Sequence, residues 1–279
     1  MRTQFRTKEE YALKFLEIAE STKAVNNIRP VRFMEVMKKN QGAIQKLTCY
    51  GNTEDGLERK NPVIVALGDS VTAGHFEFAG DPFPFFQKAD AGLLGEDDVI
   101  EITDARECYL EKFRGMLIDK YERTSVSTIN SGIAGDTILG MEKRVYRDVV
   151  RYQPDLVLIN ASLNWGPECG PTDVYEAALR RVIALILKET KADLILMTPN
   201  MEISLGVMVN TQSCLDERVE VIRKLAEEYH VGLADTYKVW KAYEAAGYPV
   251  QELLANGSNH PSTVGHEVYA KVLMQLIGE

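Results

Sequence analysis

The sequence predicts an α/β protein in which helices cover both faces of a central parallel sheet. Short β-branched or aliphatic runs, each bounded by turn residues, predict five buried strands at 62–67, 125–129, 155–160, 193–198 and 231–234. Amphipathic stretches predict helices at 104–121, 173–189, 215–229 and 262–277. Strands that alternate with helices form parallel sheets, and the continuous hydrophobicity of each strand is typical of a sheet that is buried on both faces.

Length and composition are those of an ordinary globular protein. The 279 residues are long enough to bury a sizeable core without a disulfide or metal to stabilise it, and they fit one large α/β domain. Hydrophobic residues make up 45% and charged residues 26%, which excludes a disordered or fibrous chain. Asp and Glu outnumber Lys and Arg by 41 to 32, for a net charge of −9. We therefore expect neither nucleic acid nor a membrane surface as a partner.

The sequence lacks several features that would indicate a membrane-bound or secreted protein. Charges interrupt every apolar stretch that approaches the roughly 18 residues of a membrane span, and the N-terminus lacks the apolar run of a signal peptide. The four cysteines lie far apart and form no C-x-x-C pair, which argues against a zinc knuckle and favours reduced thiols. We expect a cytoplasmic protein with no metal site and no cofactor.

Two regions fall outside the strand–helix alternation. Residues 1–60 contain helical patterns at 8–20 and 31–47 and then a polar loop at 50–61. We interpret 1–60 as an N-terminal helical extension, which packs on the sheet or on a second subunit, and 61–279 as the α/β domain. The connection 74–103 is long and rich in aromatic residues, which predicts a functional loop and argues against disorder.

Polar turns follow the first three predicted strands, where an open parallel sheet binds its ligands. Gly68-Asp69-Ser70 follows the first strand, and such a turn either exposes a serine nucleophile or caps a helix with Ser70. Glycines in Asn130–Thr137, after the second strand, can aim an amide at an oxyanion or can simply form a turn. Asn164, after the third strand, can donate its side-chain amide to the same oxyanion or can likewise be a turn residue.

The chain has four histidines, and their sequence contexts differ in how well they fit a catalytic role. His260 lies in a turn-rich loop before the last helix and is followed by a proline, which makes it the candidate general base. His75 follows the serine turn and either lines a pocket or has a structural role. We interpret His230 as a solvated residue at a helix end and His266 as a packing or capping residue.

As a set, these blocks resemble the SGNH/GDSL hydrolase family of esterases. The resemblance rests on Gly68-Asp69-Ser70, Asn130–Thr137, Asn164 and His260-Pro261, in this order, and spans residues 62–279. It implies a flavodoxin-like three-layer α/β/α sandwich. It also implies that Ser70 is the nucleophile and His260 the base, with the oxyanion held by the Ser70 and Gly135 amides and the Asn164 side chain. We expect the substrate site to include Asp69, His75, Trp165 and Asn256.

Two positions depart from the family pattern. Trp165 stands where the third block usually carries an acid, which we expect to reshape the pocket. Gly257 stands where the family places an Asp, three residues before the His. The ring of His260 must then be oriented by a backbone carbonyl, by Asn256, or by an acid from elsewhere such as Asp235.

The leading hypothesis is a serine ester hydrolase that removes a small acyl group, with acetyl on a carbohydrate as a candidate. One alternative is an acyltransferase that uses the same site with an alcohol in place of water. The other is a catalytically silent ligand-binding module, motivated by Gly257 and Trp165. In each case the partner is a small-molecule ester such as an acylated sugar, and the sequence is compatible with a homo-oligomer.

Overall fold

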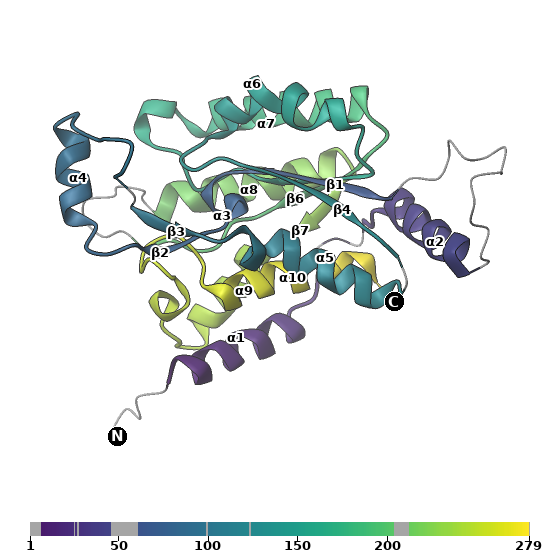
Figure 1. The fold of residues 1–279 in the computed structure, drawn as a ribbon, viewed down its shortest axis with the longest axis horizontal. Helices are drawn as coiled ribbons and strands as arrows, with labels where there is room; N and C mark the ends of the chain where they lie inside the picture. Colours follow the sequence, from purple (N-terminus) through teal and green to yellow (C-terminus); the bar gives the residue numbers. More distant parts are fainter. Residues whose placement is uncertain are drawn as a thin grey trace.

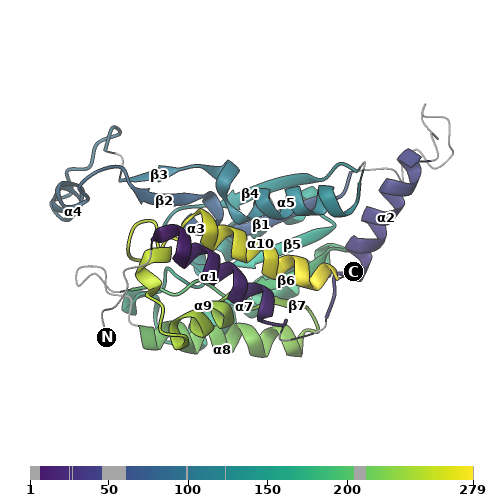
Figure 2. The same ribbon diagram turned by 90° about the horizontal axis from the view of Figure 1, so that it is seen from below.

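The centre of the molecule is a five-stranded parallel sheet with strand order β4-β1-β5-β6-β7 (Figures 1 and 2). The computed structural model describes residues 7–24, 26, 28–45, 61–98, 100–122, 124–203 and 212–278. The strands of the sheet are β1 (Val63–Gly68), β4 (Ser127–Gly132), β5 (Leu156–Asn160), β6 (Asp193–Met197) and β7 (Gly232–Ala234). Each strand overlaps its predicted segment, and the predicted fold class is confirmed.

Helices cover both faces of this sheet and complete three layers (Figures 1 and 2). One face carries α6 (Ile138–Asp148) and α7 (Thr172–Glu189), and the other carries α5 (Tyr109–Lys120), α9 (Thr236–Ala245) and α10 (Thr263–Ile277). Helix α8 (Gln212–Glu228) packs beside α7 and contributes residues to both cores. Along β1, Ile64 and Ala66 face one hydrophobic core, whereas Val65 and Leu67 face the other. Because successive side chains of a strand point to opposite faces, a strand between two cores must be apolar at every position. This is why β1 is a continuous aliphatic run.

The predicted helices agree with this arrangement, with one change. The segment predicted as one helix from Asp104 is a short 3-10 turn, η1 (Ala105–Glu107), followed by α5, and Asp104 caps the turn. Further 3-10 turns are η2 (Val150–Tyr152), η3 (Pro167–Cys169) and η4 (Val250–Leu253). No helix among the described residues is long and apolar enough to cross a membrane.

The N-terminal segment packs onto the α/β domain. Helix α1 (Lys8–Ser21) begins with a capping box between Thr7 and Glu10. Its Phe15 is fully buried, with its ring 4.8 Å from that of Trp240 and 5.2 Å from that of Tyr243. Helix α2 (Val31–Gln45) lies at the amino ends of the strands, where its Phe33 amide donates to Asp193 of β6 (Figure 1). The expected placement of this segment was on the sheet or on a second subunit, whereas α1 packs on helices α9 and α10. A boundary at residue 60 stays a prediction because residues 46–60 lie outside the described part.

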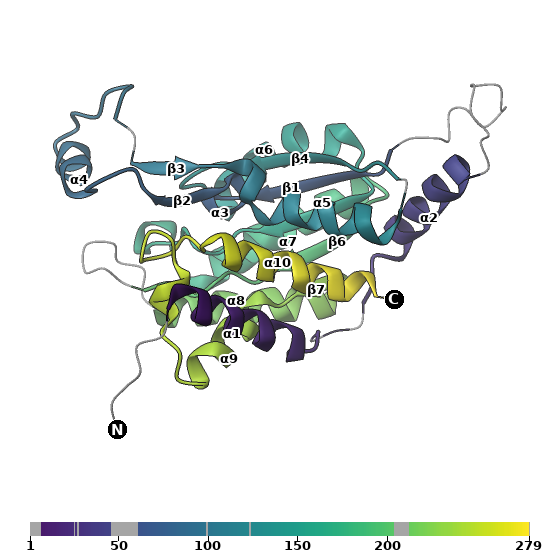
Figure 3. The same ribbon diagram turned by 60° about the horizontal axis from the view of Figure 1, so that its bottom comes forward.

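The expectation of a long loop at 74–103 is wrong. This segment is a β-hairpin formed by β2 (His75–Phe78) and β3 (Glu101–Thr103), with helix α4 (Phe83–Asp90) between the strands. We call residues 75–103 the β2–β3 arm. It extends beyond the carboxyl edge of the sheet, and α4 lies at its far end (Figure 3). Alternating apolar and polar residues at both ends of the segment are the period-two pattern of strands, and this pattern is short enough to be overlooked.

Candidate active site

The turn that carries Ser70 is formed by a close fit of a short helix, α3 (Ser70–Ala73), against the ends of β1 and β4. Asp69 Oδ1 accepts a hydrogen bond of 3.0 Å from the Val71 amide, so Asp69, and not Ser70, caps the helix. A Cβ at position 132, at the end of the neighbouring strand β4, would lie 2.2 Å from the Ala73 nitrogen, which requires glycine there. The hydroxyl of Ser70 is left without a structural role in the turn and can face other groups at the sheet edge.

That hydroxyl faces His260. Ser70 Oγ lies 2.8 Å from His260 Nε2, although the two residues are far apart in the sequence. Both side chains are almost completely buried. The spacing is that of a nucleophile and a general base, since an imidazole nitrogen at this distance can accept the hydroxyl proton. The structure therefore brings together the two residues predicted as nucleophile and base.

The other side of the His260 ring meets a carboxylate that the sequence analysis missed. His260 Nδ1 lies 2.8 Å from Glu101 Oε1, and Glu101 Oε2 lies 2.9 Å from His75 Nδ1. Asn256 Nδ2 also donates to Glu101 Oε1, at 3.1 Å. Glu101 is the first residue of β3, in the segment expected to be a loop. The signal that could have found it is the alternation Ile100-Glu101-Ile102, which predicts a strand that presents Glu101 to one side.

Glu101 is an ionised group in a largely buried setting. Burial acts to raise the pKa of its carboxyl, but the His260, His75 and Asn256 side chains outweigh burial and lower the pKa to about 2. The side chain is only 10% exposed, so these partners replace most of the water that would solvate it. Near neutral pH a negative charge is therefore held against the imidazole of His260.

Asn256 shapes the loop that carries the histidine. Its Oδ1 accepts hydrogen bonds of 3.0 Å from three successive backbone amides, those of Ser258, Asn259 and His260. Gly257 adopts a φ of +70°, in the left-handed region that favours glycine. Asn256 thus hydrogen-bonds to the backbone, to the Asn259 side chain and to Glu101, and no hydrogen bond to the His260 ring is observed.

The prediction that Asp235 could be a distant acid for His260 is wrong. It caps helix α9 through the amide of Lys238 and accepts a hydrogen bond of 2.9 Å from Thr198 Oγ1. The guanidinium of Arg223 also donates to it, with Nε at 2.9 Å. A carboxylate at the end of β7 serves the helix that follows it, because capping groups there satisfy amides that the helix leaves unpaired.

The residues expected to hold the oxyanion follow β4 and β5. Gly135, with φ +72°, is exposed in the turn after β4, and Asn164 lies after β5 with its Nδ2 3.2 Å from the Asp136 carbonyl oxygen. Parallel pairing sets Gly68 of β1 opposite Gly132 of β4 and Asn160 of β5, so the three turns begin at the same level. This register brings Gly135, Asn164 and Ser70 to one edge of the sheet, as predicted.

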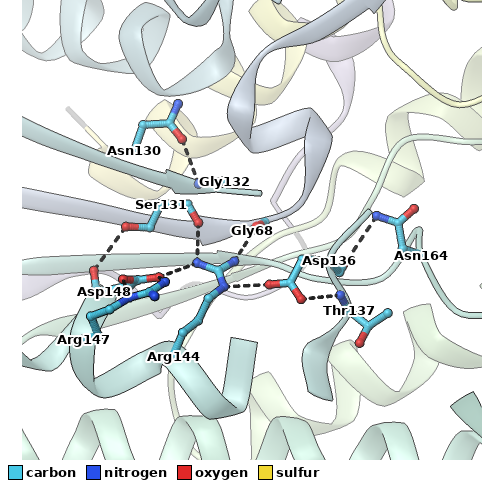
Figure 4. Close-up of polar contacts among 10 residues, drawn as sticks. All are labelled: Gly68, Asn130, Ser131, Gly132, Asp136, Thr137, Arg144, Arg147, Asp148 and Asn164. Atoms are coloured by element: carbon cyan, nitrogen blue, oxygen red, sulfur yellow. Dashed lines mark hydrogen bonds and ion pairs between the residues drawn. The ribbon is translucent and has the colours of Figure 1, made fainter. Parts of the chain in front are cut away.

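A buried arginine ties these turns together, and the sequence analysis did not single it out. Arg144 donates to the carbonyl oxygens of Gly68, at 2.9 Å, and Ser131, at 2.8 Å (Figure 4). It also pairs with Asp136, at 2.7 Å, and Asp148, at 2.9 Å. The guanidinium fork can hold two strand ends and a turn at once because its donors are rigid and planar. The available signal was an arginine on the apolar face of α6, between Met141 and Val145.

The remaining candidates take supporting positions. Asp69 is completely buried, and burial raises the pKa of its carboxyl to about 6 despite the hydrogen bond from Val71. Trp165 is buried against Tyr175, and its Nε1 donates to the Gly170 carbonyl at 2.9 Å. The interior setting of Asp69 and Trp165 favours a role in shaping the turns, and direct contact of either with substrate stays a prediction.

The histidines outside the pair with Ser70 differ in their surroundings. His266 is fully buried, accepts a hydrogen bond of 3.1 Å from the Tyr109 amide, and is neutral because burial lowers its pKa to about 3. His230 is exposed. His75 stands between these cases: it is partly buried, contacts Glu101, and its ring centroid lies 5.7 Å from that of His260. The packing interpretation of His266 and the solvated interpretation of His230 agree with the structure.

The fold, the turns at the carboxyl ends of the strands and the Ser70–His260 contact are those of a serine carboxylic ester hydrolase. The match to known proteins agrees: the chain belongs to the GDSL-like Lipase/Acylhydrolase family, whose model matches residues 66–268. The resemblance inferred from the motifs is thereby confirmed.

Individual members of the family show which enzymes the chain is similar to. An acetylxylan esterase from Geobacillus stearothermophilus is 29% identical over 180 residues, which cover 61% of this chain and 80% of the relative. A solved structure of an acetyl xylan esterase from the same organism superposes with a TM-score of 0.58 at 26% identity, covering 78% of this chain and 94% of that one. A putative GDSL-like lipase from Parabacteroides merdae reaches a TM-score of 0.61 at 20% identity, covering 79% and 97%, which shows the shared fold alone.

Proposed function

We propose that this protein is an esterase that removes acetyl groups from an acylated carbohydrate, with Ser70 as nucleophile and His260 as base. The observation that carries the proposal is the 2.8 Å contact between Ser70 Oγ and His260 Nε2 at the carboxyl edge of the sheet. The substrate class is supported by the acetylxylan esterase relative, because the match covers 80% of that protein. A short acyl group on a sugar hydroxyl is the ester that such a relative's name describes.

The reaction would run in two halves. In the first, Ser70 Oγ attacks the ester carbonyl carbon while His260 Nε2 takes the hydroxyl proton, and the sugar oxygen leaves with that proton as the carbonyl re-forms. In the second, water attacks the acetyl-serine, His260 takes a proton from the water, and acetate leaves while Ser70 recovers its hydrogen. Each tetrahedral intermediate carries its negative charge on the former carbonyl oxygen.

The oxyanion donors would be the amides of Ser70 and Gly135 and the Nδ2 of Asn164. Ser70 is the first residue of α3, where helix amides have no partner within the helix. Asn164 Nδ2 is a donor already directed at an oxygen, the Asp136 carbonyl, in the turn that contains Gly135. Donors held in place by the sheet need little reorganisation when charge develops, and for this reason they stabilise the transition state more than the ground state.

The test is acetate release from acetylated xylo-oligosaccharides by wild type and by Ser70→Ala. We expect Ser70→Ala to lose activity by about a thousandfold or more, since the covalent pathway is removed. Ser125→Ala, an exposed serine at the opposite edge of the sheet, is the matched control and should keep wild-type activity. A fluorophosphonate probe should label wild type and the control stoichiometrically and leave Ser70→Ala unlabelled.

The outcomes separate the competing functions. Ser70→Ala with a tenth of the wild-type activity would contradict the nucleophile assignment. A wild type that neither labels nor releases acetate would indicate a ligand-binding module. Formation of a new ester when an acceptor alcohol is added, at the expense of acetate, would indicate an acyltransferase. A series of acetyl, butyryl and octanoyl p-nitrophenyl esters then measures the preferred chain length, for which we expect acetyl.

A further inference from the structure

We propose that Glu101, on strand β3 of the β2–β3 arm, is the positioning acid of His260 and replaces the carboxylate that the chain lacks at Gly257. The proposal rests on the proposed function, because the reaction that it serves is the attack of Ser70 on an ester. It assigns to the arm a part in catalysis, since the arm supplies a residue that acts through the general base.

The first argument is geometry at the imidazole. His260 has Ser70 Oγ 2.8 Å from Nε2 and Glu101 Oε1 2.8 Å from Nδ1, so its two ring nitrogens face the nucleophile and the carboxylate respectively. A carboxylate at Nδ1 holds the proton there and leaves the lone pair of Nε2 directed at the serine hydroxyl. The same charge stabilises the imidazolium that forms when the serine proton is taken. Glu101 thus occupies the place of the third member of a catalytic triad.

The second argument is that Glu101 is itself held on both oxygens. Oε1 accepts from Asn256 Nδ2 at 3.1 Å, and Oε2 lies 2.9 Å from His75 Nδ1. With both oxygens engaged, the carboxylate cannot turn away from His260 without breaking a contact. His75 and Asn256 were expected to bind substrate. Their contacts with Glu101 suggest another role, which is to hold the Glu101 carboxylate in place.

The third argument is how the arm is anchored. Its first strand starts at His75, directly after the turn that ends helix α3, so the base of the arm is covalently close to Ser70. The Asp104 amide donates to the Gly74 carbonyl at 2.8 Å, and the Ala79 amide donates to the Ile100 carbonyl at 2.9 Å. Backbone hydrogen bonds on both sides of Glu101 therefore fix its position relative to the nucleophile.

The usual acid position could not do this work here. Gly257 has a φ of +70°, and a Cβ at that position would face Gln251 Nε2 at 3.8 Å. A side chain there would be strained by its backbone. In this protein the carboxylate at the His260 ring comes from the hairpin and not from the loop before His260.

Other titratable groups near His260 do not replace Glu101. His75 and Glu101 face it from the arm, Asp69 from the serine turn and His266 from α10. Asp69 Oδ1 caps α3, and His266 is a neutral packing residue whose Nδ1 faces the Tyr109 amide. Among these groups, Glu101 is the carboxylate in contact with the His260 ring.

The experiment compares Glu101→Gln with Glu77→Gln, the same change at an exposed position of the same hairpin. Gln keeps the shape and one accepting oxygen but removes the charge. We expect Glu101→Gln to lower kcat at least tenfold, with KM changed less than threefold, because the charge acts on the imidazolium in the transition state. The midpoint of the rising limb of kcat/KM against pH should move down by about one unit, since a nearby negative charge favours the protonated ring. Glu77→Gln should match wild type in all three quantities.

A conservative variant distinguishes positioning from a structural role. Glu101→Asp keeps the charge but is one methylene shorter, so it should restore the midpoint of the pH profile while recovering only part of kcat. A purely structural role would lower activity in both variants without moving the midpoint. Glu101→Gln with kcat within twofold of wild type and an unmoved midpoint would overturn the proposal.

A second measurement does not depend on activity. NMR titration of the His260 imidazole in the resting protein should show its midpoint at lower pH in Glu101→Gln than in wild type and in Glu77→Gln. If wild type releases no acetate and yet this shift is observed, the proposed function fails and the pairing of Glu101 with His260 stands. If wild type is active and the shift is absent, Glu101 is not the positioning acid.

Discussion

The two sides of the Ser70 hydroxyl are built in different ways. On one side, Gly135 and Asn164 follow strands of the same sheet as Ser70, and the register of parallel pairing sets their turns at one level. On the other side, His260 comes from a loop and Glu101 from a separate hairpin, and no strand pairing joins them. We call these the sheet side and the histidine side of the site.

The difference shows how each kind of group is held in place. The sheet side is held by backbone hydrogen bonds and by a buried cation, Arg144, which binds the carbonyls of two strand ends. The histidine side is held by side chains: Asn256 folds the loop, and Glu101 contacts His260 and His75. Backbone pairing sets the positions of the turns on the sheet side, so the effect of a substitution there depends on what the side chain itself does, whereas the side-chain network of the histidine side loses its geometry when one of its members is removed. We therefore expect large effects at the sheet-side residues that donate to the oxyanion or brace the turns, and a small effect at Gly257, which contributes no side chain to the network.

The largest effect is expected for the oxyanion donor on the sheet side. Asn164→Ala should lower kcat by about 10²–10³ with little change in KM, because a donor of this kind acts mainly in the transition state. Steady-state kinetics on p-nitrophenyl acetate measures both quantities. Asn61→Ala, at the amino edge of the sheet, should behave as wild type. An effect of Asn164→Ala confined to KM would show that Asn164 binds ground state and transition state equally.

The next effect concerns the cation that braces the sheet side. Arg144→Met should lower the free energy of unfolding by about 2–4 kcal/mol, because it leaves Asp136 and Asp148 as partly buried carboxylates that have lost a partner. The matched control is Arg181→Met, which breaks an exposed pair with Glu142 on the same layer of helices and should change stability by about 0.5 kcal/mol or less. Urea denaturation followed by circular dichroism compares them. Equal losses in the two variants would mean that Arg144 does not brace the turns.

The smallest effect is expected on the histidine side, at the place where the family carries its acid. Gly257→Asp should bring no gain in kcat and should cost about 1 kcal/mol of stability, since its φ of +70° disfavours a side chain and Glu101 already faces His260. Gly257→Asn has the same shape without the charge and should give the same stability and the same kcat. A kcat of Gly257→Asp more than twofold above that of Gly257→Asn would show that a carboxylate at 257 reaches the ring.

The sheet side could be predicted from the sequence because its signals are local. A strand and the turn that follows it are adjacent in the chain, so Ser70 after β1 and Asn164 after β5 could be placed before any contact was known. The base His260 was identified because it lies in a turn before a helix. Arg144 was overlooked because its function depends on carbonyls from two other elements, and its sequence context shows only an arginine on an apolar helix face.

By itself, the sequence determined the α/β fold, the five strands of the central sheet, four of the helices that cover it (α5, α7, α8 and α10), and the polar residues that follow its first three strands. Hydrophobic periodicity and turn residues act over a few positions, and they are therefore readable one segment at a time. Only the tertiary structure decided which carboxylate meets His260. The sequence offered Asp235 as the distant acid and gave no reason to choose Glu101, but Asp235 caps a helix and pairs with an arginine, whereas the hairpin places Glu101 at the ring. Such a contact depends on where two distant segments fold in space, and no local pattern in either segment records it.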